Sequence, residues 1–380
     1  MSTCKKEGKL TVTEYEKGIV LPQKEVTDGP KWGLGGVCDS NNHFVGSSFY
    51  DGGWATHGGF YQWEQEEYID ADVVYVGMFY LHWGHFLMDL TGRMWFLQQL
   101  AKVRTDFKVA YLGEEEPKGN NLRFFELLGI KEEQLLHITK PTRFRRVYVP
   151  EQSFKSCEWY TDEFVQMFDE MYDMVMKSQV DFSKLQDIDK VYFTRRKFAK
   201  AVCSEFGEEY FEKCFTENGY TAIAPETLRL EEQFYLWNHA KEIVCMNGTI
   251  PLNVLFSQNK DLKLTILNKT SIPHENPFVL LEMRGIEAVF LDIYMEPFKN
   301  YPKSLGEGPF LLWPSEEFEV HCQKESFVLT DDTNYRNSFF RKQKIKYCWA
   351  ILAFKHRLRI LVGRLIPKTL KAIGREICRK

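Results

Sequence analysis

The sequence predicts an α/β fold with a parallel sheet in its second half, because strand and helix patterns alternate there with short connections. Five short β-rich runs are found at 190–195, 220–224, 241–246, 262–268 and 286–294. Three helical patterns lie between them, at 204–219 with Ser204 as N-cap, at 225–240 with Thr227 as cap, and at 249–257 with Pro251 in the first turn. Because two parallel strands need a right-handed crossover between them, we expect a Rossmann-like sheet.

The first half shows a less regular α/β pattern, with a Gly-rich stretch from Gly33 to Gly59 that predicts loops. Strands are expected within 10–21 and at 72–80, 107–113 and 144–150, and helices around 121–129 and over 157–180. The polar stretch "DFSKLQDIDK" (181–190) follows the second helix and is interpreted as a linker. These boundaries predict an N-terminal α/β domain (1–180), a C-terminal Rossmann-like domain (181–335) and a tail (336–380).

Composition and charge exclude several classes of protein. Of 380 residues, 44% are hydrophobic, which is enough for two packed cores and far from a disordered chain. The nine cysteines form no CxxC pair, so we expect reduced thiols in the cytoplasm and neither a disulfide framework nor a zinc site. The chain shows no signal peptide pattern and no run of about 18 apolar residues, which argues against a spanning helix.

The run "HWGHFLMDLTGRMW" (82–95) combines a core face with a polar face if it is helical. One stripe carries the apolar residues Trp83, Leu87, Leu90, Met94 and Leu97, and a second carries His82, His85, Asp89 and Arg93. His85 and Asp89 are the candidates for a catalytic base, since Asp89 could orient the imidazole or take the proton itself. A solvated face with an ordinary His–Asp pair is the alternative, and a metal site of His82, His85 and Asp89 would need a further ligand.

Three segments of the second half indicate binding of an anion. Arg195 and Arg196 follow a predicted strand, and guanidinium groups suit phosphate oxygens, although a surface basic cluster gives the same pattern. Asn247, Gly248 and Thr249 precede a short helix whose free N–H groups could bind a diphosphate, although Asn-Gly is also an ordinary turn. Further candidates for contacts to a nucleotide or sugar are Glu226, Glu232, Gln233 and Asn253.

Cofactor motifs are missing from the sequence. It contains neither GxGxxG nor GxxxxGK[ST], which argues against nicotinamide and P-loop chemistry. The "DAD" at 70–72 has the form of a metal-binding DxD, but it precedes its strand and is interpreted as a solvated turn. We therefore expect neither a cofactor nor a bound metal.

The last 45 residues form a basic tail on an acidic body. Residues 336–380 contain 14 Lys or Arg and one acidic residue, Glu376, a net charge of +13, which leaves −17 for the remaining chain. Basic and large apolar residues alternate at helical spacing in this tail, which predicts amphipathic helices on an anionic membrane surface. Nucleic-acid binding is the alternative, but the apolar residues exceed what tracking of phosphates needs, so no nucleic-acid partner is expected.

Taken in order, these segments resemble glycosyltransferase family 61, particularly its bacterial capsular-polysaccharide members. The resemblance covers roughly residues 70–295 and rests on "HWGHFLMDLTGRMW", "VYFTRR" (191–196), "GYTAIAPETLRLEEQF" (219–234), "AKEIVCMNGTIPLNVLF" (240–256) and "LTILNKT" (264–270). Many relatives have asparagine where this chain has Trp83. The first 60 residues and the tail match no motif of the family.

The resemblance implies a GT-B architecture, in which two Rossmann-like domains face each other across a cleft. It implies an inverting transfer without metal, with the nucleotide-sugar on the second domain and a glycan or lipid-linked glycan acceptor on the first. Under this reading His85 and Asp89 are catalytic, His82 and Arg93 lie on the acceptor side, and the second-half candidates bind the donor. The expected location is the cytoplasmic face of the cell membrane. The rivals are a pyruvyltransferase of similar fold and a non-catalytic scaffold.

Overall fold

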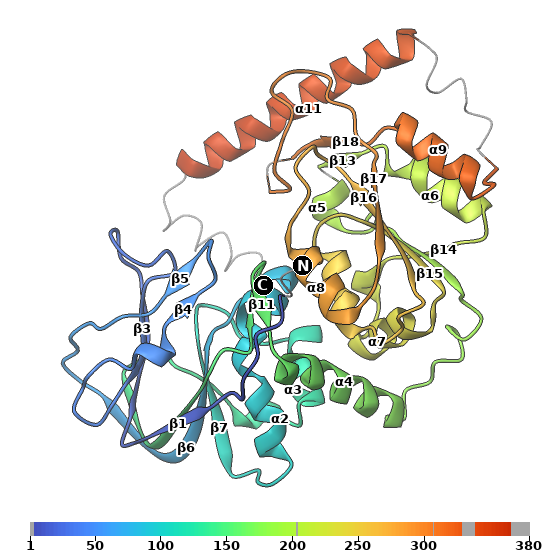
Figure 1. Cartoon of the computed structure of the whole chain (residues 1–380). Coiled ribbons are helices and arrows are strands. Elements are labelled where there is room, and N and C mark those ends of the chain that lie inside the picture. The colour runs from blue at the N-terminus through green and yellow to red at the C-terminus, as the bar shows by residue number, and fades with distance from the viewer. Residues whose placement is uncertain (1–3, 203, 307, 329–338, 366–380) are drawn as a thin grey trace, which may run out of the picture.

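The structure of the protein is a computed structural model that describes residues 4–202, 204–306, 308–328 and 339–365. The fold is mixed α/β, as the sequence predicted, and has two main sheets with helices packed against them (Figure 1). Within the described residues, every helix is too short or too polar to cross a bilayer.

A seven-stranded sheet fills the N-terminal half in the order β3-β2-β9-β6-β7-β8, with β1 also paired to β9. Its strands are β1 (Val12–Glu16), β2 (Ile19–Lys24), β3 (Leu34–Cys38), β6 (Glu67–Met78), β7 (Phe107–Leu112), β8 (Leu135–His137) and β9 (Thr142–Pro150). Strands β6 to β9 are parallel, whereas β1 and β2 run antiparallel to β9. The chain moves from β6 outward to β8 and returns to the other side of β6 with β9. The strand order therefore reverses between β6 and β9.

A five-stranded sheet fills the C-terminal half in the order β14-β12-β15-β16-β17, and all its strand pairs are parallel. Its strands are β12 (Lys190–Phe193), β14 (Thr221–Ile223), β15 (Glu242–Met246), β16 (Lys263–Asn268) and β17 (Ala288–Asp292). These are the five predicted strands, and their parallel pairing is confirmed. The order reverses between β12 and β15, and open α/β sheets bind ligands at the carboxyl ends of the strands at such a switch point.

Most of the helices pack against the two sheets, whereas the last described helix lies at the periphery (Figure 1). The helices are α1 (Trp83–His85), α2 (Trp95–Ala101), α3 (Asn120–Leu127), α4 (Asp162–Lys177), α5 (Ala199–Val202), α6 (Glu208–Glu217), α7 (Leu230–His239), α8 (Asn276–Arg284), α9 (Glu316–Lys324) and α11 (Phe339–Leu365). Short two-stranded pairs are β4 (Tyr50–Asp51) with β5 (Thr56–His57), β10 (Phe154–Lys155) with β11 (Trp159–Tyr160), and β13 (Glu205–Phe206) with β18 (Phe310–Leu311).

Several predicted helix boundaries were wrong because tertiary pairing competes with the helix. The helix expected from Ser204 begins at Glu208, since Glu205–Phe206 pair with β18 instead. The helix expected over 157–180 begins at Asp162, since Trp159–Tyr160 pair with β10. Thr227 ends a 3-10 turn, and the segment Ile250–Phe256 is 3-10.

The "DAD" segment at 70–72 is also placed differently from the prediction. It lies within β6 and not in a solvated turn. Asp72 is buried, and its carboxylate accepts hydrogen bonds from Arg104 at 2.9 Å and Arg145 at 2.8 Å. Asp72 therefore anchors β6 through these two arginines.

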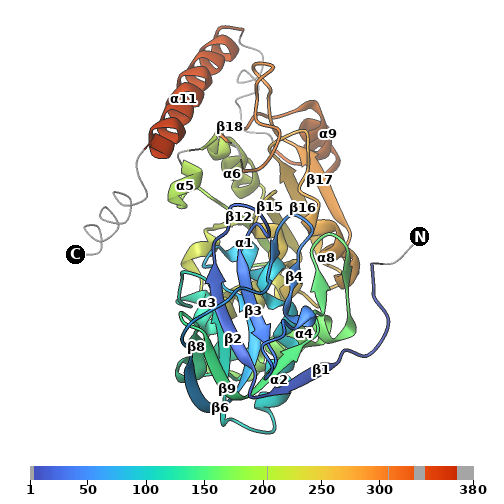
Figure 2. The same ribbon diagram turned by 90° about the vertical axis from the view of Figure 1, so that its left-hand side faces the viewer.

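One hydrophobic cluster runs through both halves of the protein, from Leu10 to Ile286. Polar contacts reinforce the junction: Trp83 Nε1 donates to Asn253 at 2.9 Å, and Arg123 binds Glu231 at 2.7 Å. Helix α11 lies beside the C-terminal half, away from the N-terminal sheet, in both views (Figures 1 and 2). Residues 336–338 and 366–380 of the predicted tail lie outside the described residues.

Because the apolar core crosses the boundary between the halves, we expect them to unfold together. Urea unfolding followed by far-UV circular dichroism and by tryptophan fluorescence should give one transition with the same midpoint for both probes. Two separated transitions would show that the halves are independent units.

Candidate active site

The run after β6 is helical but not a regular α-helix. Trp83–His85 form one α-turn, Phe86–Leu90 a π-helical turn and Thr91–Arg93 a 3-10 turn before α2 begins. The predicted contact between His85 and Asp89 survives this irregularity, with Nδ1 of His85 2.9 Å from Oδ2 of Asp89. π-turns inside helices are frequent at functional sites. This turn lies at the switch point between β6 and β9.

Asp89 is a buried and firmly anchored polar group of this run. Its side chain is 2% exposed, whereas that of His85 is 42% exposed. Oδ1 accepts a hydrogen bond from the hydroxyl of Tyr50 at 2.6 Å and from Nε1 of Trp54 at 3.0 Å. Burial and the Asp89 carboxylate raise the pKa of Tyr50 well above its usual value, so the phenol stays protonated and donates.

The contact with Asp89 bears on which nitrogen of a neutral His85 holds the proton. Oδ1 of Asp89 accepts from the indole and the phenol, and in an ionised Asp89 Oδ2 can only accept as well. Nδ1 of a neutral His85 then carries the hydrogen that Oδ2 accepts, which leaves Nε2 without a proton. A partly exposed imidazole nitrogen with a free lone pair can take a proton from a substrate hydroxyl.

The other predicted members of the two stripes separate in the structure. Leu87, Leu90, Met94 and Leu97 are buried as predicted, whereas Trp83 is only half-buried at the junction. His82 is exposed beside His85, with the two ring centroids 4.9 Å apart.

Arg93 does not share the exposed position of His82. It is buried and donates to the carbonyl groups of Pro150, Ser47 at 2.6 Å and Phe49 at 3.1 Å. The expected acceptor contact of Arg93 is therefore not supported. The side chain instead fixes the loop that brings Tyr50 to Asp89.

The second cluster lies at the switch point of the C-terminal sheet, where Thr194 and Arg195 follow the end of β12. Nε of Arg195 lies 2.9 Å from Oε2 of Glu205, whose Oε1 lies 2.8 Å from Nζ of the buried Lys269. Although burial opposes ionisation, these two cations hold the pKa of Glu205 below its usual value. Two cations thus share the carboxylate of Glu205.

The loop after β15 completes this cluster. Gly248 has a φ of +152°, and a Cβ added there would lie 3.9 Å from Nζ of Lys269. Nδ2 of the buried Asn247 donates to Asn268 at 2.8 Å, whereas its Oδ1 has no hydrogen-bond partner within the described part of the chain. Asn247, Gly248 and Lys269 therefore come together next to Arg195, and the binding of a diphosphate at this loop stays a prediction.

Arg196 lines a separate cavity and is not part of the Arg195 cluster. Its side chain is exposed and binds Glu212 at 2.8 Å. It lines a cavity of about 330 Å³ at the ends of β12 and β14, together with Thr194, Lys197, Glu212, Ala222 and Ala224. This cavity is polar and adjoins the Arg195 cluster through Thr194.

The remaining donor candidates do not gather at this cluster. Glu232 accepts from the backbone N–H of Arg229 at 2.8 Å and caps α7. Asn253 and Gln233 are buried and bound to each other at 2.8 Å, and Gln233 also donates to Pro225. Their contacts fix the junction and the turn in which the exposed Glu226 lies.

The two clusters approach each other at Gly84 and Thr249. A Cβ added to Gly84 would lie 3.2 Å from Oγ1 of Thr249, so glycine permits the close contact of the two halves. His85 follows Gly84, and Gly248 precedes Thr249. The His85–Asp89 pair and the Arg195–Lys269 cluster therefore flank one junction. No group of three or more His, Cys, Asp or Glu suited to a metal ion occurs among the residues described.

Sequence reasoning missed Tyr50, Trp54, Glu205 and Lys269. Lys269 follows β16 directly, so the rule that selected Arg195 and Asn247 at the ends of their strands would have found it. Glu205 was assigned to a helix. Tyr50 and Trp54 lie in the Gly-rich segment before the motif, where no pattern indicates which side chains turn toward Asp89.

Glu208 makes the stability of this cluster depend on pH. Burial raises the pKa of Glu208 from 4.5 to about 7, although its hydrogen bond from the N–H of Arg195 opposes the shift. Between these values the unfolded chain loses the proton and the folded protein keeps it, so stability falls as pH rises.

We predict that Glu208→Gln, which resembles the protonated acid, removes this loss. The variant should gain about 1–3 kcal/mol over the wild type at about pH 8 and little at about pH 5, measured by thermal unfolding. An equal change at both pH values would contradict the assignment.

Comparison with known proteins adds one finding. Residues 83–264 match the family model described as glycosyltransferase 61, a span that includes His85, Asp89, Arg195 and Gly248 and covers just under half of the chain. A search of curated proteins gives no match. Over these residues the chain thus resembles glycosyltransferase family 61, as its sequence predicted, although the match stops at the start of the last predicted segment (264–270). This match supports glycosyltransferase activity.

Proposed function

We propose that this protein is an inverting glycosyltransferase that moves a sugar from a nucleotide-sugar to a cell-surface or capsular polysaccharide precursor. The observation that carries the proposal is the approach of two clusters, each at the switch point of its sheet, at the contact of Gly84 with Thr249. One cluster offers a base and the other offers cations. In this proposal the two halves form a GT-B arrangement, with the acceptor on the N-terminal half and the donor on the C-terminal half.

His85 is the base in this mechanism, and Asp89 is the group that orients it. Nε2 of His85 takes the proton of the acceptor hydroxyl while that oxygen forms a bond to the anomeric carbon. The bond from the anomeric carbon to the diphosphate oxygen breaks on the opposite side, which inverts the configuration. The buried Asp89 stabilises the imidazolium through Nδ1–H, and its other oxygen is held by Tyr50 and Trp54.

The leaving diphosphate is neutralised by Arg195, by Lys269 and by the backbone N–H groups at Gly248 and Thr249. Preorganised cations in a water-poor site stabilise developing negative charge without reorganisation. Both side chains are held by Glu205, so their positions do not depend on contacts with the donor. The mechanism therefore needs no metal. The adjoining cavity lined by Arg196 is large enough to hold part of the nucleoside or sugar.

We predict that one member of a panel of UDP-, GDP-, CMP- and dTDP-sugars raises the melting temperature of the wild-type protein, since a ligand of the native state stabilises it by mass action. Asp89→Asn should keep this shift and lose transfer, because the donor cluster is intact. Arg195→Ala should lower both the shift and transfer, by about 10- to 1,000-fold in kcat/KM.

The control variant is Arg229→Ala, which removes a cation of the same half from an exposed position outside both clusters. It should behave as the wild type. No shift with any nucleotide-sugar would contradict the proposal and leave the pyruvyltransferase and scaffold rivals. Wild-type turnover in both Asp89→Asn and Arg195→Ala would contradict the assignment of the site.

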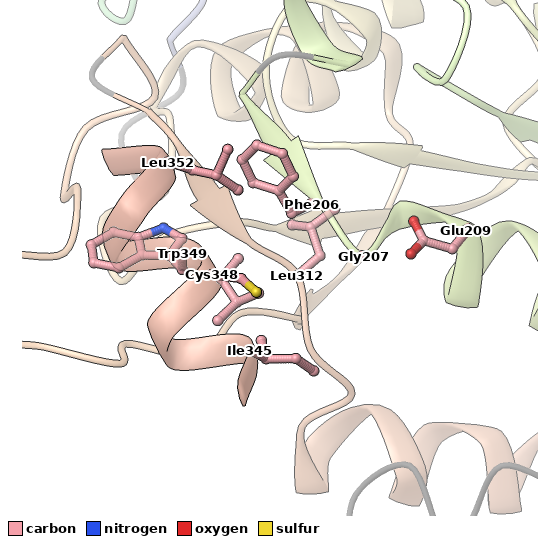
Figure 3. Close-up of a pocket in the computed structure, with 9 residues that line it drawn as sticks. Phe206, Gly207, Glu209, Leu312, Ile345, Cys348, Trp349 and Leu352 are labelled. Atoms are coloured by element: carbon pink, nitrogen blue, oxygen red, sulfur yellow. The ribbon is translucent and has the colours of Figure 1, made fainter. Parts of the chain in front are cut away.

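Helix α11 has one face that packs on the rest of the protein and an opposite face that does not. Trp349 is buried, donates to the carbonyl of Pro309 at 3.0 Å and packs against Tyr301. Beside it lies a cavity of about 160 Å³ that Ile345 and Leu352 help to line, and the side chain of Leu352 lies next to Phe206 (Figure 3).

The opposite face of α11 is apolar and exposed. It carries a stripe with steps of four and three residues, Tyr347, Ile351, Phe354, Leu358 and Leu361. Exposed cations border the stripe, Lys344 and Lys355 on one side and Arg357 on the other. An apolar stripe between flanking cations is typical of helices that lie in the headgroup region of an anionic bilayer. We therefore propose that this face holds the enzyme on the inner face of the cell membrane, close to a lipid-linked acceptor.

The double variant Ile351→Glu/Phe354→Glu should lose binding to vesicles that contain phosphatidylglycerol, because two charges enter the apolar stripe. Co-sedimentation with vesicles measures this, and both side chains are exposed, so the fold should be preserved. Val103→Glu, an exposed valine of the N-terminal half, is the matched control and should bind as the wild type. Unchanged binding of the double variant would refute the membrane role. The exposed stripe of α11 would then be interpreted as a dimer interface.

A further inference from the structure

An aromatic group stands beside the proposed base and comes from a part of the chain outside the family match. Trp32 stacks on Tyr50 with ring centroids 5.5 Å apart, and its ring meets Trp54 edge-on at 5.1 Å. Trp54 in turn stacks on the ring of His85, at 4.8 Å and 24°. Residues 31–57 thus build one wall of the site, whereas the family match begins at residue 83.

Trp54 is held in one orientation and yet remains open to solvent. Its Nε1–H donates to Asp89, and its backbone N–H donates to Gly52 in the tight turn between β4 and β5. Gly52 is required there, since a Cβ would lie 2.2 Å from the hydroxyl of Tyr50. Despite these contacts, Trp54 is 44% exposed. A fixed and exposed indole beside a base is arranged to contact a ligand.

A sugar ring matches this surface. One face of a pyranose presents C–H groups, which pack on aromatic rings, while its hydroxyl groups point outward from the edge. The imidazole of His85 covers one face of the Trp54 indole, so a sugar ring would stack on the opposite face. The single indole is too small an apolar area for an acyl chain, and it is bordered by polar groups, which favours a sugar over a lipid.

Lys31 lies at the border of this surface. Its Nζ is 4.3 Å from the centroid of the Trp54 ring, and the side chain is exposed. An exposed cation–π contact is weak, so an arriving sugar can displace the ammonium. The displaced group would remain within reach of the hydroxyl or carboxylate groups of that sugar.

We propose that Trp54, supported by Trp32 and Tyr50, is the platform on which a sugar ring of the acceptor stacks, on the indole face opposite to His85. This inference rests on the proposed function and adds the acceptor subsite to it. It assigns acceptor recognition to a segment that precedes the family match, whereas most of the donor cluster lies within that match.

Two substitutions of Trp54 separate stacking from the hydrogen bond to Asp89. Trp54→Phe and Trp54→Leu both remove the indole N–H, but only Trp54→Leu removes the aromatic face. Tyr68→Leu is the control, since Tyr68 is an exposed aromatic residue at the amino end of β6, the end remote from the site.

The binding experiment is saturation-transfer NMR on the full chain with the methyl β-glycosides of galactose, glucose and N-acetylglucosamine. At least one glycoside should receive most saturation on the ring protons of one face in the wild type, Trp54→Phe and Tyr68→Leu. Trp54→Leu should lose that signal and raise the acceptor KM about tenfold, with the donor KM unchanged.

Equal saturation in Trp54→Leu, or no saturation of any glycoside in the wild type, would overturn the platform. If a nucleotide-sugar still binds in either case, the proposed function stands without the platform. If the glycosides bind as predicted and no nucleotide-sugar binds, the proposed function fails and Trp54 remains a sugar-binding residue.

Discussion

The buried carboxylate of Asp89 organises this end of the protein. It accepts hydrogen bonds from Tyr50 and Trp54 in the β4–β5 hairpin and from His85 one turn before it in the chain. Leaving one such buried group without its partner costs about 1–3 kcal/mol, so the hairpin and the helical run stabilise each other's position. Arg93 also fixes the backbone next to Tyr50, because it donates hydrogen bonds to the carbonyl groups of Ser47 and Phe49. The exposed edge of His85 and the exposed face of Trp54 follow from these contacts.

The same topological rule places both halves of the site. In each sheet the chain moves outward, returns to the other side of its first parallel strand and leaves two strand ends beside each other. The N-terminal switch point carries His85 and Asp89, and the C-terminal one carries Arg195, Gly248 and Lys269. A continuous apolar core keeps these switch points in contact, so the junction at Gly84 depends on packing far from the site.

The sequence predicted those features that depend on local pattern. The five parallel strands, the His85–Asp89 contact and the place of Arg195 and Gly248 at strand ends all follow from short periodicities. Roles set by tertiary contacts were not predictable in this way. Arg93 shares a stripe with His85 but is turned inward by the π-turn, Gln233 and Asn253 are used at the junction, and Glu232 caps a helix. Tyr50 and Trp54 reach Asp89 only through the fold of a Gly-rich segment.

The central claim is that Asp89 fixes the proton of a neutral His85 on Nδ1 and leaves Nε2 free to act as base. It is tested most directly by ¹⁵N NMR of protein labelled at its histidine rings, recorded above neutral pH, with His85 assigned by its loss in His85→Gln. The account predicts a protonated, pyrrole-type shift for Nδ1 and a pyridine-type shift for Nε2, and in Asp89→Asn a loss of this preference. A wild-type His85 that carries its proton on Nε2 would contradict the account.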